Sequence, residues 1–161
     1  MVAVVAVAFS GRRLGTESTV SGGEAEAVGC SRTEQLTYHV HAHLAIFVEG
    51  QPVTVPANIG LRATCISWLH THDAGGVIHV EAPSAHTYLL GSFFQVWGQP
   101  LDAAHLLDRA VDGQHELRVF VNGQPYAGAP ERIPLTPHTV VVLEYGPPYV
   151  PPPPFTFPPG E

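Results

Sequence analysis

Histidines stand at alternate positions in residues 38–44, which read Tyr-His-Val-His-Ala-His-Leu. Successive side chains of a β-strand point to opposite faces, so this spacing predicts a strand with imidazoles on one face and apolar side chains on the other. The predicted imidazole face carries three residues: His39, His41 and His43. Apolar residues occupy the intervening positions from Val40 to Val48, and we expect that face to pack against the core.

A second histidine-rich segment follows at residues 68–81, and the sequence Asp-Ala-Gly-Gly in its middle predicts a hairpin. A two-residue turn at Ala74-Gly75 or at Gly75-Gly76 fits the pattern. Both registers keep the same polar residues on one face: His70, His72, His79 and Glu81. Cβ atoms of cross-strand neighbours are about 4.5–5.5 Å apart, a separation from which imidazoles can converge on one ion.

Six of the ten histidines fall between positions 38 and 81. Burial of so many imidazoles without an ion would leave many ring nitrogens in need of partners, so we favour a metal site over a purely hydrogen-bonded cluster. The predicted ligands, three or four of which would hold one ion, are His41, His43, His70, His72 and His79. His39 and Glu81 are outer candidates, and we expect Asp73 to orient one of the imidazoles.

The donor types indicate which metal the cluster suits. Imidazole with carboxylate favours Cu(II) or Zn(II), and leaves iron and nickel open. A Cu(I) site is not expected, because Met1 is the only methionine and no thiolate is expected in the cluster. The other histidines are interpreted as surface or structural residues: His86, His105, His115 and His138.

Composition sets the broad class of the chain. Its 161 residues, 45% of them hydrophobic, suit one domain with a substantial core. A net charge of -7 with only 7 lysines and arginines argues against a nucleic-acid partner. Sixteen glycines and 16 prolines are typical of turn-rich β structure. We therefore expect an α+β fold of mostly antiparallel strands, as a hairpin-built sheet, small barrel or sandwich, with one or two short helices.

Particular segments supply the other predicted elements. Residues 44–52 and 117–125 form a weak repeat, with hairpin turns at Glu49-Gly50 and at Asn122-Gly123. Helical spacing of apolar residues predicts a helix over 90–97, and Asp102 could cap a second short helix through residue 110. The apolar run at 139–145 is interpreted as a central strand.

The chain divides into an N-terminal apolar segment with a polar linker (1–29), a single β-rich metal-binding domain (30–146) and a proline-rich tail (147–161). The apolar run from Val2 to Phe9 fits the remnant of an export signal or a strand that pairs with a neighbour. In the tail we expect aromatic residues to anchor on this domain or on a second subunit. We therefore expect at least one of the two segments to pack against a folded domain, either its own or a neighbour's, which leaves self-association through Val2–Phe9 or the tail open.

Two cysteines, Cys30 and Cys65, flank the first histidine strand. The even count in a chain with export-like features favours a disulfide between them, and hence an extracellular or cell-envelope location.

Three segments carry a resemblance to a known group of proteins: the YHVHAHL motif of residues 38–44, the WLHTHD motif of residues 68–73, and the tail GPPYVPPPPFTFPPG. They resemble a family of small exported prokaryotic proteins of uncharacterised function, over residues 30–160. The resemblance implies export and no particular activity.

Three classes of function stay open, in this order of preference. The first is an exported metal-binding protein that stores, buffers or delivers copper or zinc. The second is a subunit of an extracellular fibre or assembly in which the metal is a structural staple. The third is a histidine-ligated metalloenzyme, in which an open metal position activates water or oxygen and Asp73 or Glu81 is the acid or base.

Overall fold

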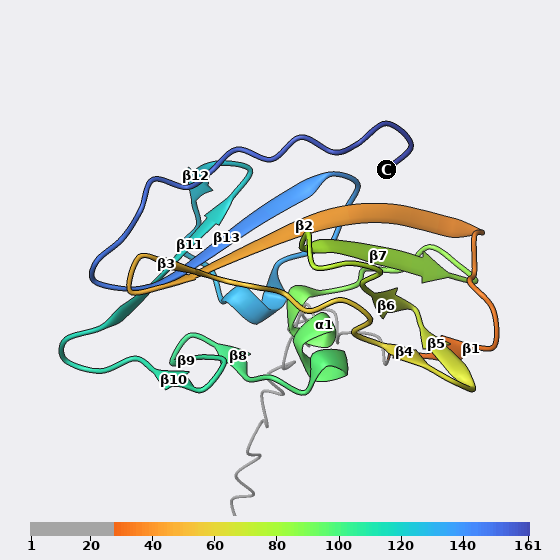
Figure 1. Cartoon of the computed structure of the whole chain (residues 1–161), viewed down its shortest axis with the longest axis horizontal. Coiled ribbons are helices and arrows are strands. Elements are labelled where there is room, and N and C mark those ends of the chain that lie inside the picture. The colour runs from red at the N-terminus through yellow and green to blue at the C-terminus, as the bar shows by residue number, and fades with distance from the viewer. Residues whose placement is uncertain (1–27) are drawn as a thin grey trace, which may run out of the picture.

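The computed structural model describes residues 28–161, which are built around one seven-stranded sheet (Figure 1). The strand order is β12-β11-β13-β2-β7-β6, and β3 pairs with β2 beside this path. The strands of this sheet are β2 (Tyr38–Val48), β3 (Gln51–Val53), β6 (Leu69–His70), β7 (Val77–Ala82), β11 (Glu116–Val121), β12 (Gln124–Pro125) and β13 (Thr139–Gly146).

Two three-stranded sheets and one α-helix complete the described part of the chain, which confirms the predicted α+β, mostly antiparallel fold class. The helix α1 spans Leu90–Trp97, as predicted, and ends at Gly98, whose φ of 78° is the left-handed conformation that glycine adopts without strain. The remaining elements are β1 (Cys30–Ser31), β4 (Leu61–Arg62), β5 (Cys65–Ser67), β8 (Leu101–Asp102), β9 (His105–Leu106), β10 (Arg109–Ala110) and the 3-10 helix η1 (Pro130–Arg132).

The predicted second helix at residues 102–110 is wrong, because this segment folds into β8, β9 and β10. Oδ1 of Asp102 accepts the N–H of Ala104 at 2.7 Å, and so closes a turn instead of capping a helix. Leu107 has a φ of 55°, which lies outside the helical region. The hydrogen bond from the backbone of Ala104 to the side chain of Asp102 thus favours a turn over a helix in this segment.

The large sheet has one face in the core and one face that carries the polar residues. Strand β2 buries Ala42, Leu44 and Ile46, as its alternation predicts. The same core cluster includes Ile78 of β7 and the α1 residue Phe93. Figure 1 shows α1 below the sheet and the C-terminal tail above it. The histidines of β2 alternate with its core residues and so lie on the face away from α1.

Strand β13 lies between β11 and β2, which confirms its predicted central position. It runs parallel to β2, in a register that pairs Thr139 with Ala42 and Tyr145 with Val48. The pairings of β2 with β3 and with β7 are antiparallel. Strand β2 is therefore held on both edges and forms the centre of the sheet.

The weak repeat forms two similar hairpins. Residues Glu49 and Asn122 both have positive φ, of 50° and 51°, and each is followed by a glycine with positive φ. These angles belong to the two-residue turn that the twist of a hairpin favours. A turn at Glu49-Gly50 places Ile46 opposite Val53, and this pairing is present in the first hairpin.

The predicted disulfide joins Cys30 to Cys65, with 5.6 Å between the Cα atoms. It links β1 to β5, which also pair as antiparallel strands. Nε1 of Trp68 donates to Oγ of Ser31 at 3.2 Å, beside the disulfide. The segment that precedes β2 is therefore fixed to the segment that precedes β6.

The proline-rich tail packs on its own domain. The ring of Phe155 stacks on His43 with 3.5 Å between centroids, and Phe157 stacks on His138 at 4.5 Å. Near the start of the tail, Arg118 lies over the ring of Tyr149, 3.6 Å from its centroid. These aromatic residues anchor the tail across the outer face of the sheet.

The apolar run from Val2 to Phe9 lies outside the described residues, so its predicted pairing stays a prediction. Within the described part, no helix has both the length and the apolar character that crossing a membrane requires.

Candidate metal centre

The two histidine rows meet on adjacent strands. In the pairing of β2 with β7, His41 lies opposite His79 and His39 lies opposite Glu81. In the pairing of β7 with β6, His70 also lies opposite His79. This is the register that a turn at Ala74-Gly75 predicts. His79 of β7 therefore lies between His41 of β2 and His70 of β6.

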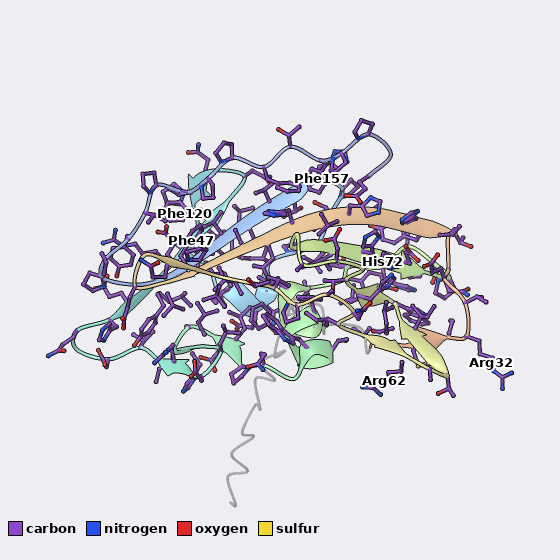
Figure 2. All side chains as sticks on the ribbon, in the orientation of Figure 1. Arg32, Phe47, Arg62, His72, Phe120 and Phe157 are labelled. Atoms are coloured by element: carbon purple, nitrogen blue, oxygen red, sulfur yellow. A yellow bond between two sulfur atoms is a disulfide. The ribbon has the colours of Figure 1, made fainter. Side chains whose placement is uncertain are left out.

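The first cluster of potential ligands contains four residues whose ligand atoms all lie within 4.8 Å of one another: His70, His72, His79 and Glu81. Nε2 of His70 lies 3.3 Å from Nε2 of His72. Nδ1 of His79 lies 3.5 Å from Oε1 of Glu81. Figure 2 shows His72 at the end of the sheet near β6 and β7, away from Phe47 and Phe120.

The second cluster shares His79 with the first and adds two residues of β2: His39, His41 and His79. Nε2 of His41 lies 3.0 Å from Nε2 of His39 and 3.1 Å from Nδ1 of His79. The ring of His79 packs near four other imidazoles, with centroid distances between 4.4 and 6.3 Å. His79 is therefore the central residue of the centre.

Glu81 connects the two clusters. Its Oε1 lies 3.2 Å from Nε2 of His39 and 3.9 Å from Nε2 of His70. The side chain is only 3% exposed, and its Oε2 is buried without a hydrogen-bond partner. Burial, followed by the nearby charge of Glu34, raises the pKa of Glu81 above its usual value. A cation beside this carboxylate would offset the cost of burying it.

Three of the clustered imidazoles have lowered pKa values: His41, His70 and His79. Burial, followed by the charge of His39, lowers the pKa of His41 to about 4. Burial, followed by the charge of His41, lowers the pKa of His79 to about 3. Burial also lowers the pKa of His70, whose Nδ1 lies 2.9 Å from the carbonyl oxygen of Ser67. That backbone contact fixes the ring and leaves Nε2 directed at the cluster, as expected for a ligating imidazole.

The distances match those between neighbouring ligands of one metal ion. Zn–N bonds of about 2.0–2.1 Å in a tetrahedral shell place neighbouring donor atoms about 3.3 Å apart. In the first cluster, the His70–His72 and His79–Glu81 separations are 3.3 and 3.5 Å. In the second, the nitrogen separations are 3.0 and 3.1 Å. The shortest separations of both sets are thus those of a small divalent ion's neighbouring ligands, while His70 and Glu81 lie 3.9 Å apart and all ligand atoms of each set lie within 4.8 Å.

His43, a predicted ligand, belongs to neither cluster. Its Nε2 lies 3.1 Å from the carbonyl oxygen of Gly75, and its ring is covered by Phe155. The other predicted ligands, His41, His70, His72 and His79, lie within the clusters, and so do the outer candidates His39 and Glu81. The strand register explains the position of His43, because it lies opposite Val77 of β7, whereas His41 lies opposite His79.

Asp73 does not orient an imidazole. Its Oδ1 accepts the N–H of Gly75 at 2.7 Å, which closes the turn between β6 and β7. Within the described residues, no histidine hydrogen-bonds to it. The role predicted for Asp73 is therefore corrected to that of a turn residue.

Sequence reasoning missed Glu34. Its Oε1 lies 3.6 Å from Nε2 of His72, and both side chains are about half exposed. The available signal was the Cys30–Cys65 pair, because a disulfide four residues before Glu34 holds this segment beside β5 and β6. Glu34 adds a negative charge at the solvent side of the centre.

The histidines interpreted as surface or structural residues supply no ligand atom to the clusters, although the backbone N–H of His138 donates to the carbonyl oxygen of His41 at 2.8 Å. Nδ1 of His105 lies 2.9 Å from Asp102, and Nδ1 of His115 lies 3.0 Å from Asp112. His138 stacks on Phe157, and His86 is exposed. None of them belongs to either cluster of potential ligands within the described chain.

Comparison of the chain with protein-family models, with curated proteins and with solved structures finds no match.

Proposed function

We propose that this protein is an exported metal-binding protein that holds Cu(II) or Zn(II) at the cluster of His70, His72, His79 and Glu81. One observation carries the proposal. Four ligand atoms from β6, β7 and the turn between them lie within 4.8 Å of one another, around a carboxylate that is 3% exposed. The two clusters together place five imidazoles and one carboxylate at one end of the sheet. Burial of so many polar groups is destabilising unless they have partners, and a bound ion would supply one.

A metal-free, hydrogen-bonded cluster explains the same geometry less well. Imidazoles can donate to one another when their tautomers alternate, so the contact between His41 and His79 needs no ion. The carboxylate is different, because Oε2 of Glu81 is buried without a partner. A buried acceptor without a donor is destabilising, and a bound cation would satisfy it.

The donor set supports the choice of metal. The clusters contain nitrogen and oxygen donors only, and both cysteines are joined in the disulfide. Such a set suits Cu(II) and Zn(II) better than Cu(I), which prefers sulfur. The largely buried position of His70 and Glu81 supports retention of the ion, as a storage or delivery protein requires.

The proposed location is the cell envelope or the extracellular space. The disulfide supports it, because such bonds persist in oxidising compartments. The resemblance to small exported prokaryotic proteins belongs to the same proposal. The tail contributes no evidence for assembly, since its aromatic residues pack on their own domain. An assembly role would therefore depend on the run from Val2 to Phe9.

Metal-assisted catalysis is a second candidate, favoured by the exposure of His72. Its side chain is 43% exposed, so an ion bound to it has one side towards solvent. Water could occupy that side and be activated. Glu34, 3.6 Å from the same imidazole, is the nearby base that such a reaction would use.

The test is a titration of metal-stripped, disulfide-bonded protein with Zn(II) and Cu(II). We expect His70→Ala to weaken binding of the first equivalent by more than about 100-fold, which exceeds the usual effect of a residue that only orients a ligand. The matched control is His105→Ala, because His105 is a histidine of the same domain that contacts Asp102 instead of the clusters. Equal affinities for these two variants would contradict the proposal.

A further inference from the structure

We infer that the centre holds two divalent ions, with the second at His39 and His41 and with Glu81 between the two. This inference rests on the proposed function and extends it from one ion to a pair. Its starting point is the number of donors. The two clusters together contain five imidazoles and one carboxylate, which is more than the four ligands of a tetrahedral ion. An ion at the first cluster leaves His39 and His41 unused.

The second cluster is at least as compact as the first. Nε2 of His41 lies 3.0 Å from His39 and 3.1 Å from His79. Nε2 of His39 also lies 3.2 Å from Oε1 of Glu81. These separations are close to the value of about 3.3 Å expected between neighbouring ligands of one ion. His39 and His41 of β2 can therefore supply two ligands of a second ion, and His79 or Glu81 can supply the third.

The strand register explains why the ligands of the two proposed ions come from strands on either side of β7. Strand β7 pairs with β2 on one edge and with β6 on the other. His79 lies opposite His41 on the first edge and opposite His70 on the second. Neighbouring strands are about 4.8 Å apart, so ions on the two edges of β7 would be close enough to share a ligand.

Glu81 has the chemistry of that shared ligand. Its Oε1 contacts both sides, at 3.2 Å from His39 and 3.9 Å from His70. Its Oε2 is buried without a partner, so a second oxygen is available for a second ion. Carboxylates that bridge paired ions place them about 3.5–4 Å apart. A negative charge between two divalent ions also reduces their repulsion.

One carboxylate does not neutralise two divalent ions, so an additional anionic group is expected on the solvent side. Glu34 lies there, 3.6 Å from Nε2 of His72, and its side chain is 44% exposed. Hydroxide from water is the simplest external group for the second ion, which has three protein ligands in His39, His41 and Glu81 and so keeps one tetrahedral position open.

The experiment measures stoichiometry and magnetic coupling on the same disulfide-bonded protein. Native mass spectrometry after loading with Zn(II) or Cu(II) should show two ions per chain. The Cu(II)-loaded protein should show an electron paramagnetic resonance intensity well below its copper content, because neighbouring Cu(II) ions couple. A chain that saturates at one ion with full intensity would overturn the inference and leave the proposed function standing, whereas a chain that retains no ion would overturn both.

Two variants locate the second ion. The double variant His39→Ala/His41→Ala should bind one ion, keep the affinity of the first equivalent within about threefold, and recover full copper intensity. The matched control is the double variant His105→Ala/His115→Ala, which should still bind two ions. Because wild-type stoichiometry and coupling need no substitution, the inference is tested even if the cluster variant folds poorly. Two retained, coupled ions in a folded cluster variant would also overturn it.

Discussion

Nε2 of His41 and Nδ1 of His79 lie 3.1 Å apart across the pairing of β2 with β7. The two residues are 38 positions apart in the chain, and only the strand register brings them together. A shift of one residue would turn either histidine to the core face, where Ala42 and Ile78 now lie. The apolar residues that fix the register therefore also fix the metal centre.

His79→Ala should reduce metal binding more than any other single histidine substitution, because His79 belongs to both clusters. We expect a loss of more than about 100-fold for the first equivalent, beyond the effect of removing an orienting partner. His43→Ala is the matched comparison from the same histidine face, and should change affinity by less than about threefold. Calorimetric titration of both variants with Zn(II) is the measurement. Similar losses in the two variants would instead favour a site that includes His43.

Acid should destabilise the metal-free protein. His41 and His79 have pKa values lowered to about 4 and about 3, against 6.5 for the unfolded chain. As pH falls below 6.5, the unfolded state therefore binds more protons than the folded state. The free energy of unfolding then decreases progressively down to about pH 3–4. Each unit by which the pKa is lowered corresponds to about 1.4 kcal/mol. Denaturant unfolding between pH 7 and pH 4.5, in a chelator, measures the slope.

The matched variants for this pH dependence are His41→Gln and His105→Gln. The first should have a shallower loss of stability below pH 6.5, since it removes one buried neutral imidazole. The second should keep the wild-type slope, because His105 is an exposed residue. A wild-type slope in both variants would assign the pH dependence to other groups.

Glu144→Gln should stabilise the protein at pH 7 and have little effect at low pH. Glu144 is 1% exposed, and its burial raises its pKa above the usual value. A carboxyl group whose pKa is higher in the folded than in the unfolded state stabilises the fold at pH values below the unfolded pKa. This stabilisation is lost as pH rises through the folded pKa. Glutamine keeps an oxygen for the backbone N–H of Val150 and removes the charge. The expected gain at pH 7 is about 1 kcal/mol, a usual size for one substitution.

Measurement of this gain needs unfolding curves at pH 7 and pH 4 for wild type and Glu144→Gln. The control is Glu116→Gln on the neighbouring strand β11, whose side chain is exposed. A variant that is destabilised at both values of pH would mean that the carboxylate of Glu144 is ionised and well compensated.

Removal of the disulfide should lower the free energy of unfolding by about 3–4 kcal/mol, as a chain-entropy estimate gives for a loop of this length. The loop closed by Cys30 and Cys65 spans a sequence separation of 35. The variant is Cys30→Ser/Cys65→Ser, compared with wild type by denaturant unfolding. In a strong reductant the two proteins should unfold at the same denaturant concentration. A difference that persists after reduction would assign the effect to the serines.

Phe155→Ala should loosen the tail and cost about 1–2 kcal/mol, less than for a fully buried phenylalanine because the ring is half-buried. The lost contact is the stack on His43, with 3.5 Å between centroids. Thr156→Ala, at the exposed neighbouring position, is the matched control. Equal unfolding midpoints for the two variants would contradict an anchoring role for Phe155.

Alternation within strands made much of the fold predictable from the sequence. It assigned the core face of β2, and the glycine-containing turns located the hairpins after Val48 and Val121. It also predicted that His41 and His79 lie on the polar faces of their strands, and these strands pair side by side in the sheet. These inferences succeeded because they depend on residues that are neighbours in one strand or one hairpin.

Contacts between distant segments were not predictable in the same way. The ring of His43 is covered by Phe155, which comes from the tail more than 100 positions later. The approach of Glu34 to His72 depends on a disulfide and on a loop without regular structure. At residues 102–110 the helical pattern was too short to outweigh the turn formed by Asp102.

The position of the centre in the chain has a consequence for biosynthesis. Both cysteines and all the clustered residues lie between Cys30 and Glu81, in strands that pair with one another. The parallel partner of β2 comes much later, with Thr139 opposite Ala42. Because the chain is made from its N-terminus, every residue of the centre is synthesised before β13, which pairs with the edge of β2 opposite β7.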